Sequence, residues 1–398
     1  MKLFWMFAFL ICISCNGTTQ PYQTANPTTY LLGKSIGKLP ALSYGLGDDR
    51  LGGAKMGYID TGVLFKIVDS VGSMYKVQLS KLHSAFIEKE SISCDTIFKS
   101  KPFYLTSSFK SNGTDSMYDI VAIGLDEKLP YSSYMDINPS KIQVLIYGVQ
   151  SNTNWITQLS SCKEVKNLFY KQIEDDVVQV TIELNHQTHW GYSIGYEGKR
   201  LTLKIKKQPL NLSLKNLRIA IDAGHGGSNT GARGLKFNIA EKDYTLLIAK
   251  QLKKYLEKKG VKDVYMIRDT DTGIEMKDRV LLTKNFNPDL LVSIHLNSSN
   301  KKEVSGTSTY YKHIGFRPLS NYILDQMLDL QLNEFGNIGS FNFTLNAPTD
   351  FINTLVEVAF LSNEEDEKKI MNPKFHTQVA TKITAGINNW LKYVKSID

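Results

Sequence analysis

The pattern of hydrophobic and polar positions changes along the chain. Short β-type runs occupy 57–69, 73–80 and 84–92, and apolar and polar residues alternate over 177–184 and within 200–207. A period of two is typical of half-buried strands. Turn-forming residues separate these runs, so we expect closely spaced strands in the first half of the chain, arranged as two small β-rich units.

From Leu217 onward the pattern becomes strand, helix, strand. The runs 217–222 and 290–297 are dense in Val, Ile and Leu, as strands buried on both faces require. The segment 242–260 carries apolar side chains at helical spacing, namely Tyr244, Leu247, Ile248, Leu252, Tyr255 and Leu256. Strands alternating with helices predict an α/β domain with a twisted, mostly parallel sheet and helices on both faces.

A chain of 398 residues is too long for one ordinary domain, and 42% hydrophobic residues supply ample core material. We expect a signal peptide over 1–15, a linker over 16–34, a β-barrel module over 35–93, a second β domain over 100–208 and the α/β domain over 215–398.

The first fifteen residues have the order of a secretory signal. A cationic residue precedes the apolar run from Leu3 to Ile13, which is shorter than the ~20 residues that span a bilayer. Cys15 stands where a bacterial lipoprotein carries its lipidated first residue, but Cys12 replaces the usual Leu of that pattern. We expect an exported protein of the periplasm or cell envelope, and a lipid anchor at Cys15 stays open.

Charge and cysteine content narrow the function class. The net charge of +8 is modest for this length, the Lys residues are scattered, and we find no helical or finger-type nucleic-acid motif. Nucleic acid is therefore not an expected partner. Outside the leader the chain keeps Cys94 and Cys162, which form either one disulfide or two buried free thiols.

Three residues of the C-terminal half stand where chains commonly build metal sites. His225 follows a predicted strand in a Gly-rich turn, Glu241 begins a predicted helix, and His295 ends another strand. In α/β sheets, functional groups gather where strands end. Each residue alone is equally explained by packing or by the helix dipole. Together, two histidines and a carboxylate suit a catalytic zinc ion, which takes three protein ligands and keeps one position for water.

Glu357, near the end of a strongly apolar strand, is the candidate proton carrier. Zinc lowers the pKa of its bound water to about 7, but an amide nitrogen leaves poorly unless it is protonated. A second group must therefore carry the proton, and an apolar strand would raise the pKa of Glu357 to suit that task. The alternatives are a fourth metal ligand and a structural carboxylate. If these four residues converge, the chain is a hydrolase.

Other candidates carry less weight. Arg279 either holds the sheet together or meets a substrate carboxylate, and the structural role is favoured. Trp190, Tyr192 and Tyr196 form either a sugar-stacking face or part of a β core, and the core is favoured.

Residues 217–398 resemble the zinc-dependent N-acetylmuramoyl-L-alanine amidases. The segments IDAGHGG, AEKDYTL, LLVSIHLN and TLVEVAFLSNEEDE match that family in order and spacing. The resemblance implies that His225, Glu241 and His295 hold Zn²⁺, with Glu357 as the catalytic carboxylate. It also implies the substrate, which is the amide between N-acetylmuramic acid and L-alanine in peptidoglycan, and a role in cell-wall remodelling or daughter-cell separation.

The N-terminal segments carry looser resemblances. Residues 35–93 resemble a bacterial SH3-like module, and residues 100–208 resemble the AMIN-type β domain that precedes amidase domains in some envelope proteins. An envelope protein that activates the enzyme is a further partner to consider. Two other functions stay open, namely a zinc peptidase acting within the stem peptide and a catalytically inactive, wall-binding adaptor.

Overall fold

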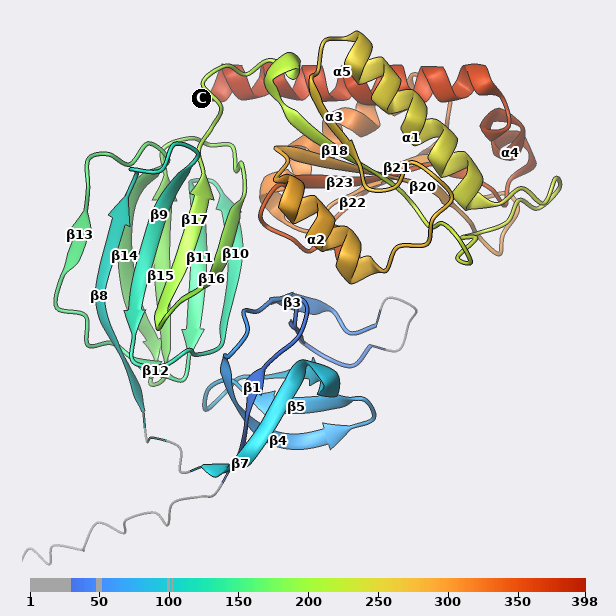
Figure 1. Cartoon of the computed structure of the whole chain (residues 1–398). Helices are drawn as coiled ribbons and strands as arrows, with labels where there is room; N and C mark the ends of the chain where they lie inside the picture. The colour runs from blue at the N-terminus through green and yellow to red at the C-terminus, as the bar shows by residue number, and fades with distance from the viewer. Residues whose placement is uncertain (1–29, 48–51, 99–100, 102) are drawn as a thin grey trace, which may run out of the picture.

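The computed structural model describes residues 30–47, 52–98, 101 and 103–398. The predicted signal peptide over 1–15, with Cys15, lies outside these residues, as does the predicted linker up to residue 29. Figure 1 shows three units, in blue, green and yellow to red. Within the described residues, no helix is long and apolar enough to span a membrane.

The N-terminal module (residues 30–98) is a sheet with the strand order β3-β2-β6-β5-β4-β1-β7. Its strands are β1 (Tyr30–Ser35), β2 (Ala41–Ser43), β3 (Lys55–Tyr58), β4 (Leu64–Val71), β5 (Met74–Gln78), β6 (Ser84–Glu88) and β7 (Ile92–Phe98), with the 3₁₀ turn η1 (Lys89–Ser91). Their inward side chains form its core, namely Leu42, Phe65, Val77, Ala85 and Ile87.

The linker prediction is wrong for residues 30–34, because β1 already begins at Tyr30. Leu32 is buried, and the strand pairs antiparallel with both β4 and β7. The apolar Leu31-Leu32 pair therefore belongs to the first strand of the module and not to the polar stretch before it.

The second unit is a sandwich of two sheets, in the orders β10-β11-β15-β14 and β12-β8-β9-β17-β16, with β13 paired to β8. Its strands are β8 (Tyr104–Asn112), β9 (Tyr118–Leu125), β10 (Tyr131–Ile137), β11 (Ser140–Tyr147), β12 (Val149–Gln150), β13 (Ile156–Gln158), β14 (Val165–Glu174), β15 (Val177–Leu184), β16 (Tyr192–Glu197) and β17 (Arg200–Lys206). Alternate residues of the facing strands fill the space between the sheets, among them Val121, Ile123, Val144, Val180 and Leu203.

Two of the three candidate aromatic residues of this unit belong to its core. Trp190 and Tyr192 are buried, and the Trp190 ring packs against Trp390 with centroids 5.4 Å apart. Tyr196 donates its hydroxyl to the carbonyl oxygen of Leu129 at 2.7 Å. The sugar-stacking alternative is therefore wrong for Trp190 and Tyr192, which have no ring face open to a ligand.

The C-terminal unit has the sheet order β19-β18-β20-β23-β21-β22. Neighbouring strands are parallel except β21 and β23, so the predicted α/β class with a mostly parallel sheet is confirmed. The elements are η2 (Leu214–Asn216), β18 (Arg218–Ala223), α1 (Glu241–Lys258), β19 (Asp263–Met266), α2 (Met276–Phe286), β20 (Leu290–Asn297), β21 (Thr307–Tyr310), η3 (Ile314–Phe316), α3 (Arg317–Leu328), β22 (Glu334–Ile338), η4 (Thr344–Asn346), β23 (Ile352–Phe360), α4 (Glu364–Ile370) and α5 (Pro373–Ile397).

Strand alternation supplies a separate core for each face of this sheet. Ile219 and Ile221 of β18 join the core formed with α1 and α5, whereas Ala220 joins a smaller core with Val280 of α2 and Leu345 of η4. In Figure 1, α1 and α5 lie on one side of the sheet and α2 on the other. The predicted helix over 242–260 is α1, but its Leu247 is 49% exposed and takes no part in the core.

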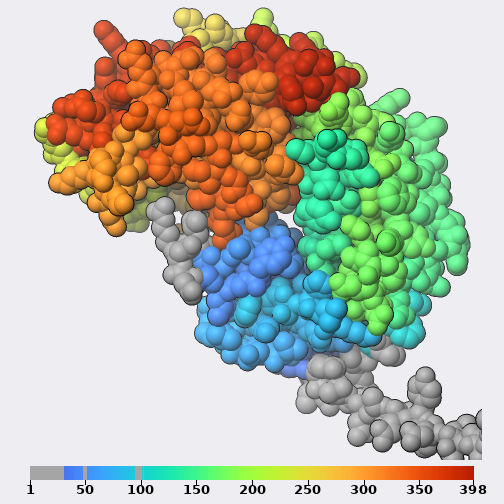
Figure 2. Space-filling model, turned by 180° about the vertical axis from the view of Figure 1, so that it is seen from behind, coloured from blue at the N-terminus to red at the C-terminus, as the bar shows by residue number. Residues whose placement is uncertain are grey.

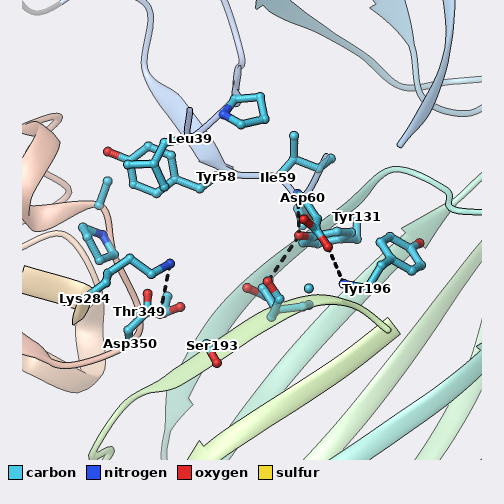
Figure 3. Close-up of a pocket in the computed structure, with 18 of the residues that line it drawn as sticks. Leu39, Tyr58, Ile59, Asp60, Tyr131, Ser193, Tyr196, Lys284, Thr349 and Asp350 are labelled. Carbon is cyan, nitrogen blue, oxygen red and sulfur yellow. Dashed lines mark hydrogen bonds and ion pairs between the residues drawn. The ribbon is translucent and has the colours of Figure 1, made fainter. Parts of the chain in front are cut away.

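The N-terminal module touches both other units (Figure 2). A cavity of about 390 Å³ lies where the three meet (Figure 3). At its wall, the Tyr196 amide donates to Asp60 Oδ2 at 2.6 Å, and the Asp60 amide donates to the Tyr131 hydroxyl at 3.0 Å. On the opposite side, Lys284 pairs with Asp350 at 3.0 Å.

Both cysteines outside the leader are free thiols, so the disulfide alternative is wrong. Cys94 is exposed and Cys162 is half-buried. The alternative of two buried free thiols is therefore right that no disulfide forms, but wrong that both thiols are buried.

Candidate metal centre

His225, Glu241 and His295, the three predicted ligand residues, come together in the structure. Each offers one ligand atom, and these atoms all lie within 4.8 Å of one another. Glu241 stands between the two rings, with Oε2 3.0 Å from His225 Nε2 and Oε1 3.0 Å from His295 Nδ1. Two imidazoles and a carboxylate from three separate segments therefore meet where the central strands β18 and β20 end.

The Gly-rich turn after β18 brings these groups close because it lacks side chains at two contact points. A Cβ atom on Gly224 would lie 2.4 Å from His295 Cε1. A Cβ atom on Gly231 would lie 2.5 Å from Glu241 Oε2, and the φ of Gly231 is +66°. Any larger residue at either position would push the histidine or the carboxylate away.

Glu241 is the first residue of α1, where the helix dipole favours a carboxylate. Two backbone amides fix its orientation, since the Ala232 amide donates to Oε2 at 2.9 Å and the Leu296 amide donates to Oε1 at 3.1 Å. Burial alone would raise the pKa of Glu241, but its hydrogen bonds with His225 and His295 outweigh burial and hold that pKa well below its usual range. The group is therefore a carboxylate at neutral pH.

The two histidines differ in the surroundings of the ring nitrogen that does not face Glu241. Burial opposes protonation of His225, but its bond with Glu241 outweighs burial and raises its pKa. Its Nδ1 lies 2.9 Å from Asn229 Oδ1, a contact that orients the ring. His295 Nε2 is buried and has no hydrogen-bond partner among the described residues. A buried ring nitrogen without a partner is costly, and a metal ion would satisfy it. The three side chains thus fit a divalent cation.

Glu357 stands beside this group in the sheet. On β23 it pairs in parallel register with His295 of β20. Register partners on adjacent strands project from the same face, and adjacent strands lie ~4.8 Å apart. Glu357 is half-buried there. The fourth residue predicted from the sequence is therefore a neighbour of the metal centre, and its role as proton carrier stays a prediction.

Arg279 of α2 has the favoured structural role. It is buried, and its Nη1 donates to Asp222 Oδ1 at 2.6 Å and to the Ala223 carbonyl oxygen at 2.8 Å. Its Nη2 donates to the carbonyl oxygen of His225. These bonds tie α2 to the end of β18 and hold the backbone of a candidate ligand.

Sequence reasoning missed two neighbours of the centre. Asn229, which orients His225, follows it by four residues in the same turn, and that short spacing was an available signal. Phe343 meets the His295 ring edge-on, with centroids 5.4 Å apart and planes at 85°. It lies in the loop before η4, more than forty residues from His295 along the chain, so no local pattern pointed to this contact.

Residues 219–389 match the family model described as N-acetylmuramoyl-L-alanine amidase, Amidase_3. The germination-specific N-acetylmuramoyl-L-alanine amidase of Bacillus subtilis is 30% identical over 199 residues, which cover 45% of this chain and 82% of that protein.

Two further proteins resemble the same region. The N-acetylmuramoyl-L-alanine amidase AmiC of Escherichia coli is 31% identical over 215 residues, 42% of this chain and 51% of that protein, so the match spans about half of its length. The crystal structure of an N-acetylmuramoyl-L-alanine amidase from Clostridium difficile 630 has 32% identity and a TM-score of 0.43, covering 45% of this chain and 98% of that one. By the family match and the Bacillus relative, this chain belongs to the Amidase_3 family of N-acetylmuramoyl-L-alanine amidases.

Proposed function

We propose that this chain is a zinc-dependent hydrolase that cuts the amide between N-acetylmuramic acid and L-alanine in peptidoglycan. The convergence of His225, Glu241 and His295 is the observation that carries the proposal. Family membership supplies the bond that is cut, since the geometry alone would serve several amide hydrolases.

The proposed mechanism divides the work among these side chains. His225, Glu241 and His295 would hold the zinc ion, and Glu241 is already ionised at neutral pH before the ion binds. A bound zinc ion would supply Lewis acidity, which polarises a carbonyl and acidifies water. Glu357 takes a proton from the water as the water oxygen bonds the carbonyl carbon, and returns that proton to the amide nitrogen as the carbon–nitrogen bond breaks, because an amide nitrogen leaves poorly unless it is protonated.

The proposed place of action is outside the cytoplasm, where peptidoglycan lies. Export would depend on residues 1–15, and the proposed role is wall remodelling or separation of daughter cells. Peptidoglycan strands with their stem peptides are the proposed partner, with an envelope activator protein as a second one. Palmitate labelling of the wild type and of Cys15→Ser would decide between a lipid anchor and a free mature chain.

The deciding experiment combines zinc content with product mass. Purified sacculi are digested with the full chain, with and without a chelator, and the products are weighed by mass spectrometry. We expect about one zinc per chain, glycan strands stripped of all peptide, and loss of activity on chelation that added zinc restores. Glycan strands that keep an L-alanine stub would identify a peptidase instead. No release by the zinc-loaded chain would leave the inactive, wall-binding adaptor.

A further inference from the structure

We infer that the N-terminal module clamps the wall loop (residues 339–346), which forms one side of the metal centre, and so holds Phe343 against His295. Asn342 is the positioning residue that joins module and loop. The inference rests on the proposed function for its effect on catalysis, whereas the clamp itself is a matter of contacts between the two units.

Asn342 binds the backbone of the module with both ends of its amide. The Lys55 amide donates to Asn342 Oδ1 at 2.9 Å. Asn342 Nδ2 donates to the carbonyl oxygens of Gly53 at 2.9 Å and Gly52 at 3.4 Å. One side chain of the wall loop thus satisfies backbone groups at the start of β3.

The loop is held again two residues later. The Tyr58 hydroxyl at the end of β3 donates to the Thr344 carbonyl oxygen at 3.2 Å. Lys312, which follows β21, donates its Nζ to the Lys55 carbonyl oxygen at 2.5 Å. Residues at both ends of β3 therefore bond the wall loop. Lys55 of this strand also accepts a hydrogen bond from Lys312, which follows β21 of the α/β sheet.

Phe343 lies between the two held residues, Asn342 and Thr344, and its ring meets the edge of His295. Because the Asn342 side chain and the Thr344 carbonyl oxygen are both bonded to the module, the position of the Phe343 ring depends on docking of the module. Phe341 extends the same wall, stacked on Phe343 with centroids 6.1 Å apart and packed on Tyr310 at 4.5 Å.

The module lies on the side of the sheet from which the candidate site residues project. His295 and Glu357 alternate with core residues of the α1 face, so they project toward the α2 and η4 face. Figure 1 shows β3 beneath α2, on that side. Among the described residues, three ion pairs of the module reach α2 itself, from Lys277 to Glu88 at 2.7 Å and to Glu90 at 3.4 Å, and from Lys38 to Asp278 at 3.0 Å.

These contacts make the module a part of the catalytic unit and not a passive tether. A substrate bound beside His295 would lie against the aromatic wall, and a loosened wall would hold it less well. Loss of the clamp should therefore raise KM more than it lowers kcat, while His225, Glu241 and His295 keep their metal.

The test compares Asn342→Ala with Asn321→Ala in the full, zinc-loaded chain. Asn321 lies on α3, where its side-chain amide donates to Asp325 of the same helix and to no other of the described residues. In Asn342→Ala we expect faster hydrogen exchange in residues 339–346 and 52–58, unchanged zinc content, and a rise in KM of about fivefold, equivalent to one lost hydrogen bond. Asn321→Ala should match the wild type in all three.

A substitution outside the loop gives an independent check. Lys277→Glu places like charges opposite Glu88 and should speed exchange in both segments, and adding Glu88→Lys should slow it again. Wild-type exchange of the wall loop and wild-type KM in Asn342→Ala would overturn the inference. If Asn342→Ala fails to fold, the Lys277 and Glu88 pair decides by the same readouts. A wild type without amidase activity would defeat the proposed function instead, and hydrogen exchange would still report on the clamp.

Discussion

Glu241 orients both imidazole rings of the candidate metal centre, because each of its carboxylate oxygens lies beside a different histidine. The backbone amides of Ala232 and Leu296 hold those same oxygens from behind. Contacts within the protein thus orient the three side chains by themselves, which would lower the ordering cost of binding a metal ion there.

At the scale of single residues, the sharpest prediction concerns Glu357. Glu357→Gln keeps the shape of the side chain but removes its ability to carry a proton. We expect kcat to fall about 10²- to 10⁴-fold, the usual contribution of a general acid or base, with zinc content unchanged. Turnover of muropeptides and metal analysis measure the two quantities.

Glu365→Gln is the matched control, since Glu365 lies on α4 with a 77% exposed side chain and should retain full activity. Loss of zinc in Glu357→Gln would favour the alternative of a fourth ligand. Wild-type activity in that variant would remove Glu357 from the mechanism.

The four site residues could be predicted because each stands at the start of a helix, just after a strand or within the last residues of a strand, where the sequence pattern changes. Phe343 could not be predicted, because its contact with His295 depends on a loop more than forty residues away along the chain. Contacts set by docking of distant segments leave no periodic signal.

At the scale of elements, the turn between β18 and α1 determines whether the centre forms. Gly231→Ala should cost about 1–3 kcal/mol in the free energy of unfolding, since it combines a positive φ with a Cβ atom 2.5 Å from Glu241 Oε2. Zinc affinity should fall as well. Denaturant titration and metal binding by competition with a chelator measure both effects.

Gly273→Ala serves as the comparison, because the nearest atom to its added Cβ lies 3.4 Å away and belongs to Gly226. Equal stability and equal zinc affinity of the two variants would show that the turn tolerates a side chain near the carboxylate.

The joint between α2 and β18 gives a second prediction at this scale. Arg279→Met leaves Asp222 buried without its cation, and removal of one partner from a buried pair typically costs about 3–5 kcal/mol. Lys284→Met on the same helix removes a cation whose side chain is 33% exposed and should cost about 1 kcal/mol or less. Urea unfolding measures the stability of both variants. Equal losses of unfolding free energy would contradict the structural role of Arg279.

The element pattern of the C-terminal unit was predictable because Val-, Ile- and Leu-rich strands alternate with amphipathic helices. The antiparallel pairing of β21 with β23 was not, since the direction of a short strand such as Thr307–Tyr310 depends on tertiary packing. For the same reason the composition of residues 16–34 concealed the start of β1.

At the scale of the whole molecule, the contact between the N-terminal module and the α/β unit should respond to pH through Lys312. Burial, reinforced by the charge of Lys55, lowers the pKa of Lys312 to about 8 from 10.5. Below pH 8 the folded chain holds a partly buried cation. Between about 8 and 10.5 the folded chain has lost this proton and the unfolded chain has not, so stability rises with pH in that window.

Lys312→Met lacks this titration. The difference in unfolding free energy between wild type and Lys312→Met should therefore shift in favour of the wild type as pH rises from 8 toward 10. Urea titrations at several pH values measure that difference. The titration of the other lysines largely cancels, because both proteins carry them. A difference that stays constant, or moves the other way, would contradict the lowered pKa.

The place of β1 in the N-terminal module has a mechanical consequence. Tyr30, the first residue of β1, pairs with Phe98, the last residue of β7, so the chain enters and leaves the module at one end of the same strand pair. Tension between the residues before Tyr30 and the β-sandwich would act at that end of the strand pair. The backbone hydrogen bonds between β1 and β7 would then break one after another and not all together in shear. A pull along the chain would therefore peel the edge strand β7 from β1 first, because β1 is also held by β4, and the β3 strand that bonds the wall loop, at the opposite edge of this sheet, would be among the last to be loaded.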